Sequence, residues 1–202
     1  MKVYAPLKAR EKYIHEVIDD KTPWIVKSIT RLEKRRVLPA PLNYISGEKI
    51  SYLGKEYILR VITGKRGPSE LLDDSLIIRT ITQDENAVRR SLDKWYRSRA
   101  REVFTDCIRR CIPAAFPGGI GEPLLSIRLM KRRWGICRPS GKITLNLRLI
   151  QMPLICVEFI VMHEICHLKH PDHSGRFYSF LSECMPDWKE RKKLLDDIRL
   201  IY

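Results

Sequence analysis

Several features that would place a chain outside the cell or in a membrane are missing from this sequence of 202 residues. Met1–Pro6 holds no apolar segment behind a basic tip, so we expect no secretory signal. No run approaches the ~20 apolar residues that cross a bilayer, so we expect no membrane partner. The six cysteines include no Cys-x-x-Cys pair and lie in apolar or helical stretches, which is typical of reduced, mostly buried thiols. The expected location is therefore cytoplasmic.

Acidic residues are scarce: 24 Asp and Glu stand against 38 Lys and Arg, which gives a formal net charge of +14. Such an excess suits a nucleic acid, an anionic membrane or an acidic protein, and equally a soluble protein with solvated basic faces. The imbalance is sharpest from Pro123 to Val157, which holds seven basic residues, Arg128 to Arg148, and no acidic one. A helix expected at 84–112 carries eight more. These two stretches form the candidate nucleic-acid surface.

The length and a hydrophobic content of 44 % predict one domain, or one domain with a small extension. We expect an N-terminal helical and β region at 1–82 and a catalytic region at 83–202, together forming one compact unit. Residues 8–36 are predicted to form two helices, the second capped by Thr22 and beginning at Pro23.

Two β-rich stretches follow, 57–62 and 76–81, separated by glycine, proline and aspartate. They predict a small antiparallel β unit. Asp84 can then cap the long helix at 84–112. Period-two alternation in 125–129 and in 143–149 predicts two half-buried strands with a turn at 138–141 between them.

The central motif is His163-Glu164-Ile165-Cys166-His167. It lies in 153–169, a stretch that is apolar on nearly all faces and therefore predicts a buried helix. Residues four apart share a helix face, so His163 and His167 can bind one metal ion, with Glu164 one position further round. Polar groups in a buried helix are costly unless they are paired or ligating. This spacing is typical of a zinc site in which the glutamate acts as general base.

A third ligand must come from further along the chain. His170 is seven residues beyond His163, about 10 Å along the helix axis, too far for nitrogens that bind one zinc at ~2.0–2.1 Å. Pro171 breaks the helix there, so the chain can turn back and bring His173 to the metal. The offset from His163 to His173 equals that in the H-E-x-x-H-x-x-G-x-x-H pattern. The alternative is a later carboxylate, Glu183 or Asp187.

A series of short matches then runs along the chain: Arg133-Trp134-Gly135-Ile136-Cys137, Gly141, Asn146, Arg148-Leu149, the segment from His163 to Leu168, His173-Ser174, Phe177 and Pro186-Asp187-Trp188. In these residues, from about 122 to 197, the chain resembles the YgjP-like metallopeptidase family, zincins distantly related to the SprT-like and WLM domains. Residues 52–57 also look like a family feature, which would extend the resemblance over most of the chain.

The resemblance implies an α+β, zincin-like catalytic domain, with a small antiparallel sheet beside the active-site helix. It implies Glu164 as catalytic base and three metal ligands: His163, His167 and His173. Matched residues that could bind substrate are Arg133, Trp134, Asn146 and Arg148. Ile136 stands where a serine is common, and Tyr178 where a tryptophan is common; neither belongs to the metal set.

The site predicts zinc-dependent hydrolysis of a peptide or protein substrate by a metal-bound water, with one Zn²⁺ per chain. Nickel and cobalt also suit imidazole. Two other functions stay open: a protease recruited to nucleic acid, and a non-proteolytic metal-dependent hydrolase acting on another carbonyl or phosphoryl group. A binding module with a structural metal is disfavoured, because such a site needs no base.

Supporting roles are also predicted. An extended substrate could pair with the edge of the strand at 124–130 or at 143–149. A ligand histidine could be oriented by one of three polar residues: Asp172, Asp187 or Asn146. Cys107 and Cys111 are four apart and could share a metal, but buried core cysteines are the stronger interpretation.

Overall fold

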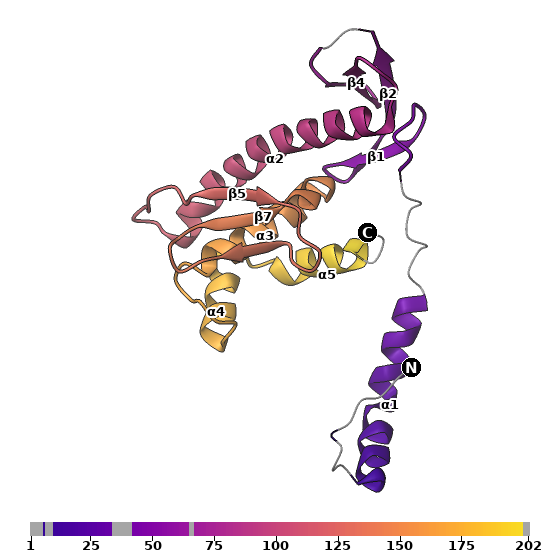
Figure 1. Ribbon diagram of the computed structural model, residues 1–202. Helices are drawn as coiled ribbons and strands as arrows, with labels where there is room; N and C mark the ends of the chain where they lie inside the picture. Colours follow the sequence, from indigo (N-terminus) through magenta and orange to yellow (C-terminus); the bar gives the residue numbers. More distant parts are fainter. Residues whose placement is uncertain (1–5, 7–9, 34–41, 65–66, 200–202) are drawn as a thin grey trace. The chain divides into compact units, whose positions relative to one another are not determined.

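The computed structural model describes residues 6, 10–33, 42–64 and 67–199 (Figure 1). The chain divides into two compact units, one formed by 1–39 with 199–202 and the other by 40–198. The larger unit thus joins residues 40–82 to the residues that follow them. The division of the chain into a region 1–82 and a catalytic region 83–202 stays a prediction.

The described residues from 10 to 33 form one helix, α1 (Glu11–Glu33), where we expected two. Pro23 lies inside α1. Thr22, the expected cap, instead donates its hydroxyl to the carbonyl of Ile18 at 2.8 Å, within the continuous helix. The predicted break is wrong because a proline removes one N–H donor without always ending a helix. The last residues of the expected helix, 34–36, lie outside the described residues.

The larger unit begins with a four-stranded sheet in the order β1-β2-β4-β3, built from β1 (Lys49–Tyr52), β2 (Lys55–Thr63), β3 (Glu70–Leu72) and β4 (Ser75–Thr80). Strands near 57–62 and 76–81 are confirmed, but the prediction that they are antiparallel is wrong, because β2 and β4 run parallel. The short strand β3 pairs antiparallel with the far edge of β4. It carries the chain back along the sheet before β4 begins, so that β4 runs in the direction of β2.

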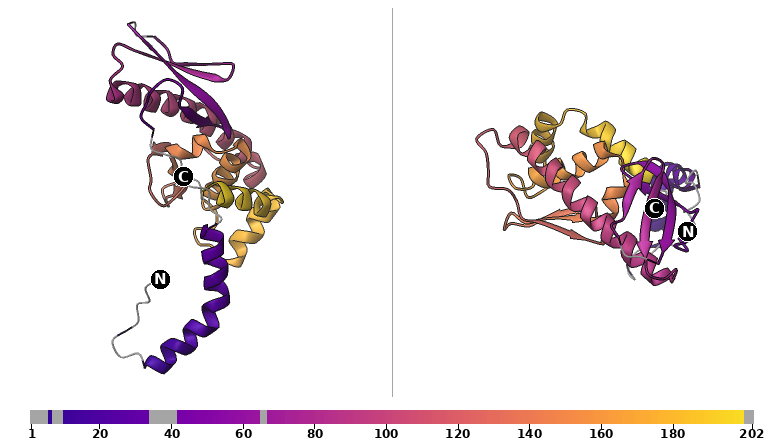
Figure 2. Two further views of the ribbon diagram at one scale, coloured as in Figure 1. Left: turned by 90° about the vertical axis from the view of Figure 1, so that its right-hand side faces the viewer. Right: turned by 90° about the horizontal axis from the view of Figure 1, so that it is seen from above.

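The long helix α2 (Glu85–Ala115) begins where Asp84 accepts a hydrogen bond from the backbone N–H of Ala87 at 3.0 Å, which confirms the predicted cap. It ends three residues later than expected and includes Pro113. Its buried face packs under the sheet near its N-terminus and against the helix at 154–166 further along (Figure 2). That face consists mainly of Val88, Leu92, Trp95, Ala100, Phe104, Cys107, Ile108 and Cys111.

A second, three-stranded sheet has the order β5-β7-β6, with β5 (Leu125–Arg128), β6 (Gly135–Cys137) and β7 (Ile143–Asn146). The predicted turn at 138–141 closes the antiparallel hairpin of β6 and β7, where the Arg138 N–H donates to the Lys142 carbonyl at 3.0 Å. It does not join β5 to β7, because β6 intervenes and β5 runs parallel to β7.

The strand predicted at 143–149 ends at Asn146, and the next residues form a short 3-10 helix, η1 (Leu147–Gln151). Three helices complete the unit: α3 (Leu154–Cys166), α4 (Gly175–Cys184) and α5 (Trp188–Arg199). The architecture is mixed α+β, as expected, but the sheet beside α3 is not wholly antiparallel, because β5 and β7 run parallel. Among the described helices, none combines the length and apolar composition that a membrane span requires.

The tight turn between β1 and β2 fastens the first sheet to the segment that leads into α3. The N–H groups of Leu53 and Gly54 donate to the carbonyls of Ile150 and Gln151 at 2.9 and 3.1 Å. Gly54 has a positive φ of 79°, and a Cβ there would lie 2.8 Å from Cγ of Pro153. Only glycine fits this turn against the start of α3, which gives a structural reason for the motif at 52–57.

Candidate metal centre

The helix α3 is buried on nearly every side, as its composition predicts. Glu164 is one of the few charged side chains in the core, with 4 % of its surface exposed. His163 and His167 are half-buried, and His173 is exposed. The group therefore lies at the boundary between core and solvent, where small molecules or an unfolded chain could reach it.

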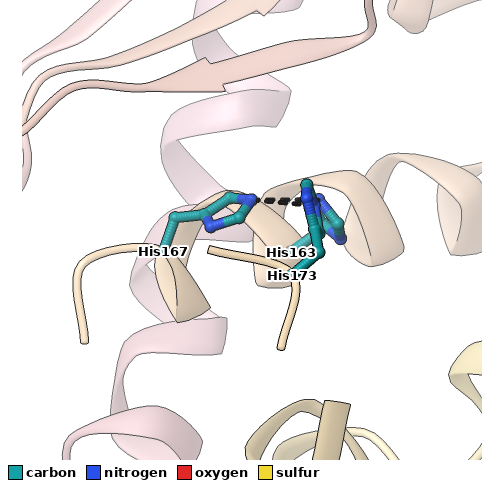
Figure 3. A group of neighbouring side chains, drawn as sticks. All are labelled: His163, His167 and His173. Atoms are coloured by element: carbon teal, nitrogen blue, oxygen red, sulfur yellow. Dashed lines mark hydrogen bonds between the residues drawn. The ribbon is translucent and has the colours of Figure 1, made fainter. Parts of the chain in front are cut away.

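Three histidine side chains converge on one point (Figure 3). The Nε2 atom of His167 lies 3.2 Å from Nε2 of His163 and 3.2 Å from Nε2 of His173, and the remaining pair is 3.0 Å apart. His163 and His167 come from successive turns at the end of α3, and His173 comes from the segment before α4. The chain thus turns back after α3, as we inferred from Pro171.

The donor set fits a tetrahedral transition metal. Nitrogens bound to zinc at 2.0–2.1 Å in tetrahedral geometry lie about 3.3 Å apart, within a few tenths of an ångström of the three separations here. Burial, followed by the neighbouring imidazoles, lowers the pKa of His163 to about 3, and burial lowers that of His167. Neutral imidazoles are the form that binds a metal.

The carbonyl oxygen of His170 orients His167, lying 3.0 Å from its Nδ1. With the proton on Nδ1, the lone pair of Nε2 points at the centre of the group. The ring of His170 itself packs against Phe180, with centroids 5.3 Å apart. His170 therefore contributes its backbone to the site, a role that residue identity cannot reveal.

Two of the polar residues suggested for orienting a ligand, Asp172 and Asp187, form hydrogen bonds elsewhere, although the charge of Asp172 also opposes the lowering of the His167 pKa by burial. Asp172 accepts a hydrogen bond from Ser174 at 3.0 Å, and Asp187 accepts one from Arg191 at 2.8 Å. Asp187 and Glu183, the alternative ligands, are not part of the three-histidine group.

The ring of Phe177 contacts all three imidazoles. It is fully buried, and its ring centroid lies 4.9, 4.6 and 5.0 Å from those of His163, His167 and His173. A stack continues outward, in which Tyr178 lies over His173 at 6.2 Å and over Trp188 at 5.5 Å. The aromatic residues of α4 and α5 thus restrict how the histidines can move.

Glu164 is held by the edge strand β6. Burial raises the pKa of its carboxyl group to about 7, while a hydrogen bond from the backbone of Cys137 and the charge of Arg133 act in the opposite direction. A divalent cation at the histidines would also oppose this rise. A Cβ on Gly135 would lie 2.7 Å from Cδ of Glu164, so the absence of a side chain there admits the carboxylate.

The hydrogen-bond ladder explains why Cys137 can donate to Glu164. Trp134 and Arg138, on either side of β6, face β7. The Asn146 N–H donates to the Trp134 carbonyl at 2.8 Å, and the Arg138 N–H donates to the Lys142 carbonyl at 3.0 Å. Antiparallel pairs alternate, so the backbone groups of Gly135 and Cys137 point away from β7. The outer edge of β6 thus borders Glu164.

Of the four residues expected to bind substrate, Asn146 has a structural role. It is buried, and its side chain donates to the carbonyls of Met130 and Arg133 at 2.8 Å each and accepts from two backbone N–H groups. These four bonds use the full hydrogen-bonding capacity of the amide, which disfavours direct contact with a substrate. The amide instead shapes the loop that leads into β6. Substrate binding by Asn146 stays a prediction.

The other three expected residues are placed differently. Arg133 is exposed near Glu164, whose pKa its charge affects. Trp134 is half-buried against the core, and its indole N–H has no hydrogen-bond partner among the described residues. Arg148 is exposed on η1. Substrate contact by these residues stays a prediction.

In a comparison with protein families, the model of the YgjP-like, metallopeptidase domain matches residues 1–198. The chain belongs to the YgjP-like family. No curated protein matches it. Among solved structures, the metallopeptidase zymogen abylysin of Pyrococcus abyssi is similar at 22 % identity and a TM-score of 0.41, over 47 % of this chain and 90 % of that one. Because the matching family model describes a metallopeptidase domain, this YgjP-like chain is a member of a metallopeptidase family.

Proposed function

We propose that this YgjP-like protein is a zinc-dependent peptidase in which His163, His167 and His173 hold the ion. The observation that carries the proposal is the convergence of three Nε2 atoms within 3.2 Å of one another beside a buried glutamate. Held there, zinc would polarise the scissile carbonyl and lower the pKa of a water molecule.

Glu164 is the general base. Its carboxylate takes the proton from the attacking water and returns it to the leaving amine, so that one residue serves both steps. The Cys137 N–H and the close approach of Gly135 hold this carboxylate in one position. Fixing the base in this way reduces the reorganisation needed during the reaction.

The outer edge of β6 is the proposed peptide-binding strand. Gly135 and Cys137 direct backbone groups away from β7, and one of these, the Cys137 N–H, bonds to Glu164. The remaining outward groups of this edge could pair with an extended substrate beside Glu164. Of the two strands suggested earlier, β7 lies between β5 and β6 and has no unpaired edge within the described sheet. β5 is an edge strand, but β6 is the one that packs against α3.

The six cysteines are free thiols in the structure, which supports the expected cytoplasmic location.

The family and the donor set favour zinc, and cobalt or nickel could replace it without changing the ligands.

The test is metal analysis of the pure protein together with a digest of a mixed peptide library. The wild type should carry about one zinc per chain and cut peptides. His163→Ala should lose the zinc, whereas Glu164→Gln should keep it and lose turnover by ~10²–10⁴-fold. His170→Ala is the matched control, because its backbone carbonyl stays in place and the zinc should remain.

Full zinc occupancy in His163→Ala would sink the ligand assignment. A zinc-loaded wild type that cuts no peptide but hydrolyses a small ester or phosphate would favour the non-proteolytic alternative.

A further inference from the structure

Four exposed basic side chains lie in single file along α2: Arg90, Lys94, Arg97 and Arg101. Their spacing of four, three and four residues keeps them on one helix face. At 1.5 Å per residue, the file extends over about 16 Å. Val88, Leu92 and Trp95 are buried, and each lies two positions, about 200°, before Arg90, Lys94 or Arg97. These three basic side chains therefore point away from the core, and Arg101 is exposed as well. We call these four residues the α2 stripe.

The charge of the stripe is not neutralised within the protein. In the part of the chain that the structure describes, none of its four members forms an ion pair. Other arginines of α2 do have partners: Arg99 binds Glu102 at 3.0 Å, and Arg110 binds Asp106 at 2.9 Å. A row of like charges without counter-charges is electrostatically unfavourable alone, and an anionic partner would relieve it.

A cleft of about 850 Å³ opens at the N-terminal end of the stripe, between α2 and β4. Arg90 and Lys94 line one side, and Arg79 of β4 lines the other. Among the described residues that line it there is no Asp or Glu, although Arg79 is paired with Glu70 at 2.7 Å outside the lining. The hydroxyl groups of Ser91 and Ser98 add hydrogen-bonding capacity. The Nε atom of Arg99, which also lines the cleft, is buried without a described partner.

A second hollow of about 300 Å³ continues from the first, since Ser98 lines both. Arg97 and Arg101 line it, together with Ile127 of β5. Its single acidic lining residue, Glu102, is paired with Arg99. The two hollows and the stripe form one basic track, which runs from the four-stranded sheet to the three-stranded sheet.

We propose that this basic track binds the phosphate backbone of a single-stranded nucleic acid. The ligand must be linear, because the cations stand in one file with about 5 Å between neighbours along the axis. A nucleic-acid strand carries one charge per backbone unit at a spacing of the same order. An acidic protein presents carboxylates mixed with basic groups, which would be repelled by an unbroken row of cations.

The track is separate from the metal centre. Its side chains lie on the solvent face of α2, whereas α3 packs against other parts of that helix. It also differs from the basic stretch Arg128–Arg148, of which no residue lines either hollow. Binding of the nucleic acid therefore does not need the zinc ligands, and loss of the metal leaves this binding intact.

The experiment measures fluorescence anisotropy of a labelled single-stranded DNA of about 20 nucleotides against the full chain at several salt concentrations. In the stripe variant, Arg90, Lys94, Arg97 and Arg101 are all changed to Gln. A control variant removes the same charge elsewhere, by changing Lys12, Lys55, Arg60 and Lys193, all exposed, to Gln. Both variants should keep the zinc content of the wild type.

The wild type should bind with a Kd that weakens steeply with salt. The stripe variant should bind about tenfold or more weakly at about 50 mM salt, with a salt slope shallower by about 3, that is ~0.7 for each of four phosphate contacts. The control variant should keep most of the affinity and slope, and His163→Ala should bind like the wild type.

Equal losses in the stripe and control variants would overturn the assignment, because net charge alone would then explain binding. No binding at about 50 mM salt would overturn it as well. Competition by polyglutamate as strong as that by unlabelled DNA would indicate an unselective anionic surface, and competition by inorganic triphosphate at equal phosphate concentration would indicate a site for small phosphate compounds.

Discussion

The carboxylate of Glu164 lies directly against the backbone of Gly135. A Cβ at residue 135 would lie 2.6 Å from Cγ of Glu164 and 2.7 Å from Cδ, closer than any real contact of this kind. Gly135 lies in β6 and has no positive φ, so the requirement comes from the neighbouring carboxylate and not from the backbone conformation. The edge strand and the base therefore fit together only when residue 135 has no side chain.

Gly135→Ala should displace the carboxylate and lower kcat by ~10²-fold, because a shift of about 1 Å in a reacting group has an effect of this size. Zinc content should stay near that of the wild type, since no ligand moves. The check is kcat on a cleavable peptide together with metal analysis. Gly118→Ala is the control, because a Cβ there meets nothing within 4 Å. An unchanged kcat in Gly135→Ala would remove the positioning role of this contact.

Phe177→Leu should weaken zinc binding by about tenfold to a hundredfold, because the ring contacts all three imidazoles. It should also lower the free energy of unfolding by roughly 1–3 kcal/mol. Competition with a chelator measures the first effect and denaturant unfolding the second. Phe180→Leu, on the same helix and also buried, should destabilise the fold while leaving the zinc affinity in place. Equal zinc affinities in the two variants would contradict the prediction.

Gly54→Ala should destabilise the protein more than Gly47→Ala. Both glycines have positive φ, 79° and 97°, so both substitutions introduce backbone strain of roughly 1–3 kcal/mol. Only at Gly54 would the new methyl group also meet Pro153. The difference between the two unfolding free energies, measured in denaturant, isolates the docking of the β1–β2 turn. Equal losses would show that this turn tolerates a side chain.

The native protein should react slowly with thiol reagents at pH 8. Burial raises the pKa of Cys107 to about 11 and that of Cys111 to about 12, and Cys156 and Cys166 are equally buried. Because the pKa of a buried thiol is raised, the thiol stays protonated in the folded state. The stability that this thiol contributes therefore falls as the pH rises above ~8.5, the pKa of a cysteine in the unfolded chain. The reaction is followed by the absorbance of the thiolate that the reagent releases. All six thiols should react rapidly in denaturant, whereas in buffer the half-buried Cys137 and Cys184 should react before the other four. Rapid reaction of all six in buffer would contradict the burial described here.

The same burial bears on Cys107 and Cys111, the pair that could have shared a metal. Among the described residues, the only group of three or more side chains that could hold a metal is the histidine group. These cysteines belong to the core face of α2 instead.

The periodic patterns of the sequence predicted most helices and strands, because local geometry dictates them. The Asp84 cap and the all-round apolar helix α3 are examples. These patterns did not predict that β2 pairs parallel with β4, or that β5 pairs parallel with β7. In both sheets a three-residue strand, β3 or β6, pairs with the later strand of the parallel pair, and so short a segment has too few residues to show a period.

For the metal centre, the sequence by itself determined the pair His163 and His167, because residues four apart share a helix face. The helix break at Pro171 favoured His173 as third ligand but left Glu183 or Asp187 open, and the structure brings His173 to the pair. Only the tertiary structure decided what surrounds those donors: the His170 carbonyl on His167, the Phe177 ring beneath the imidazoles, and the edge of β6 against Glu164. These contacts join segments through backbone atoms and shape, which carry no signature in residue order.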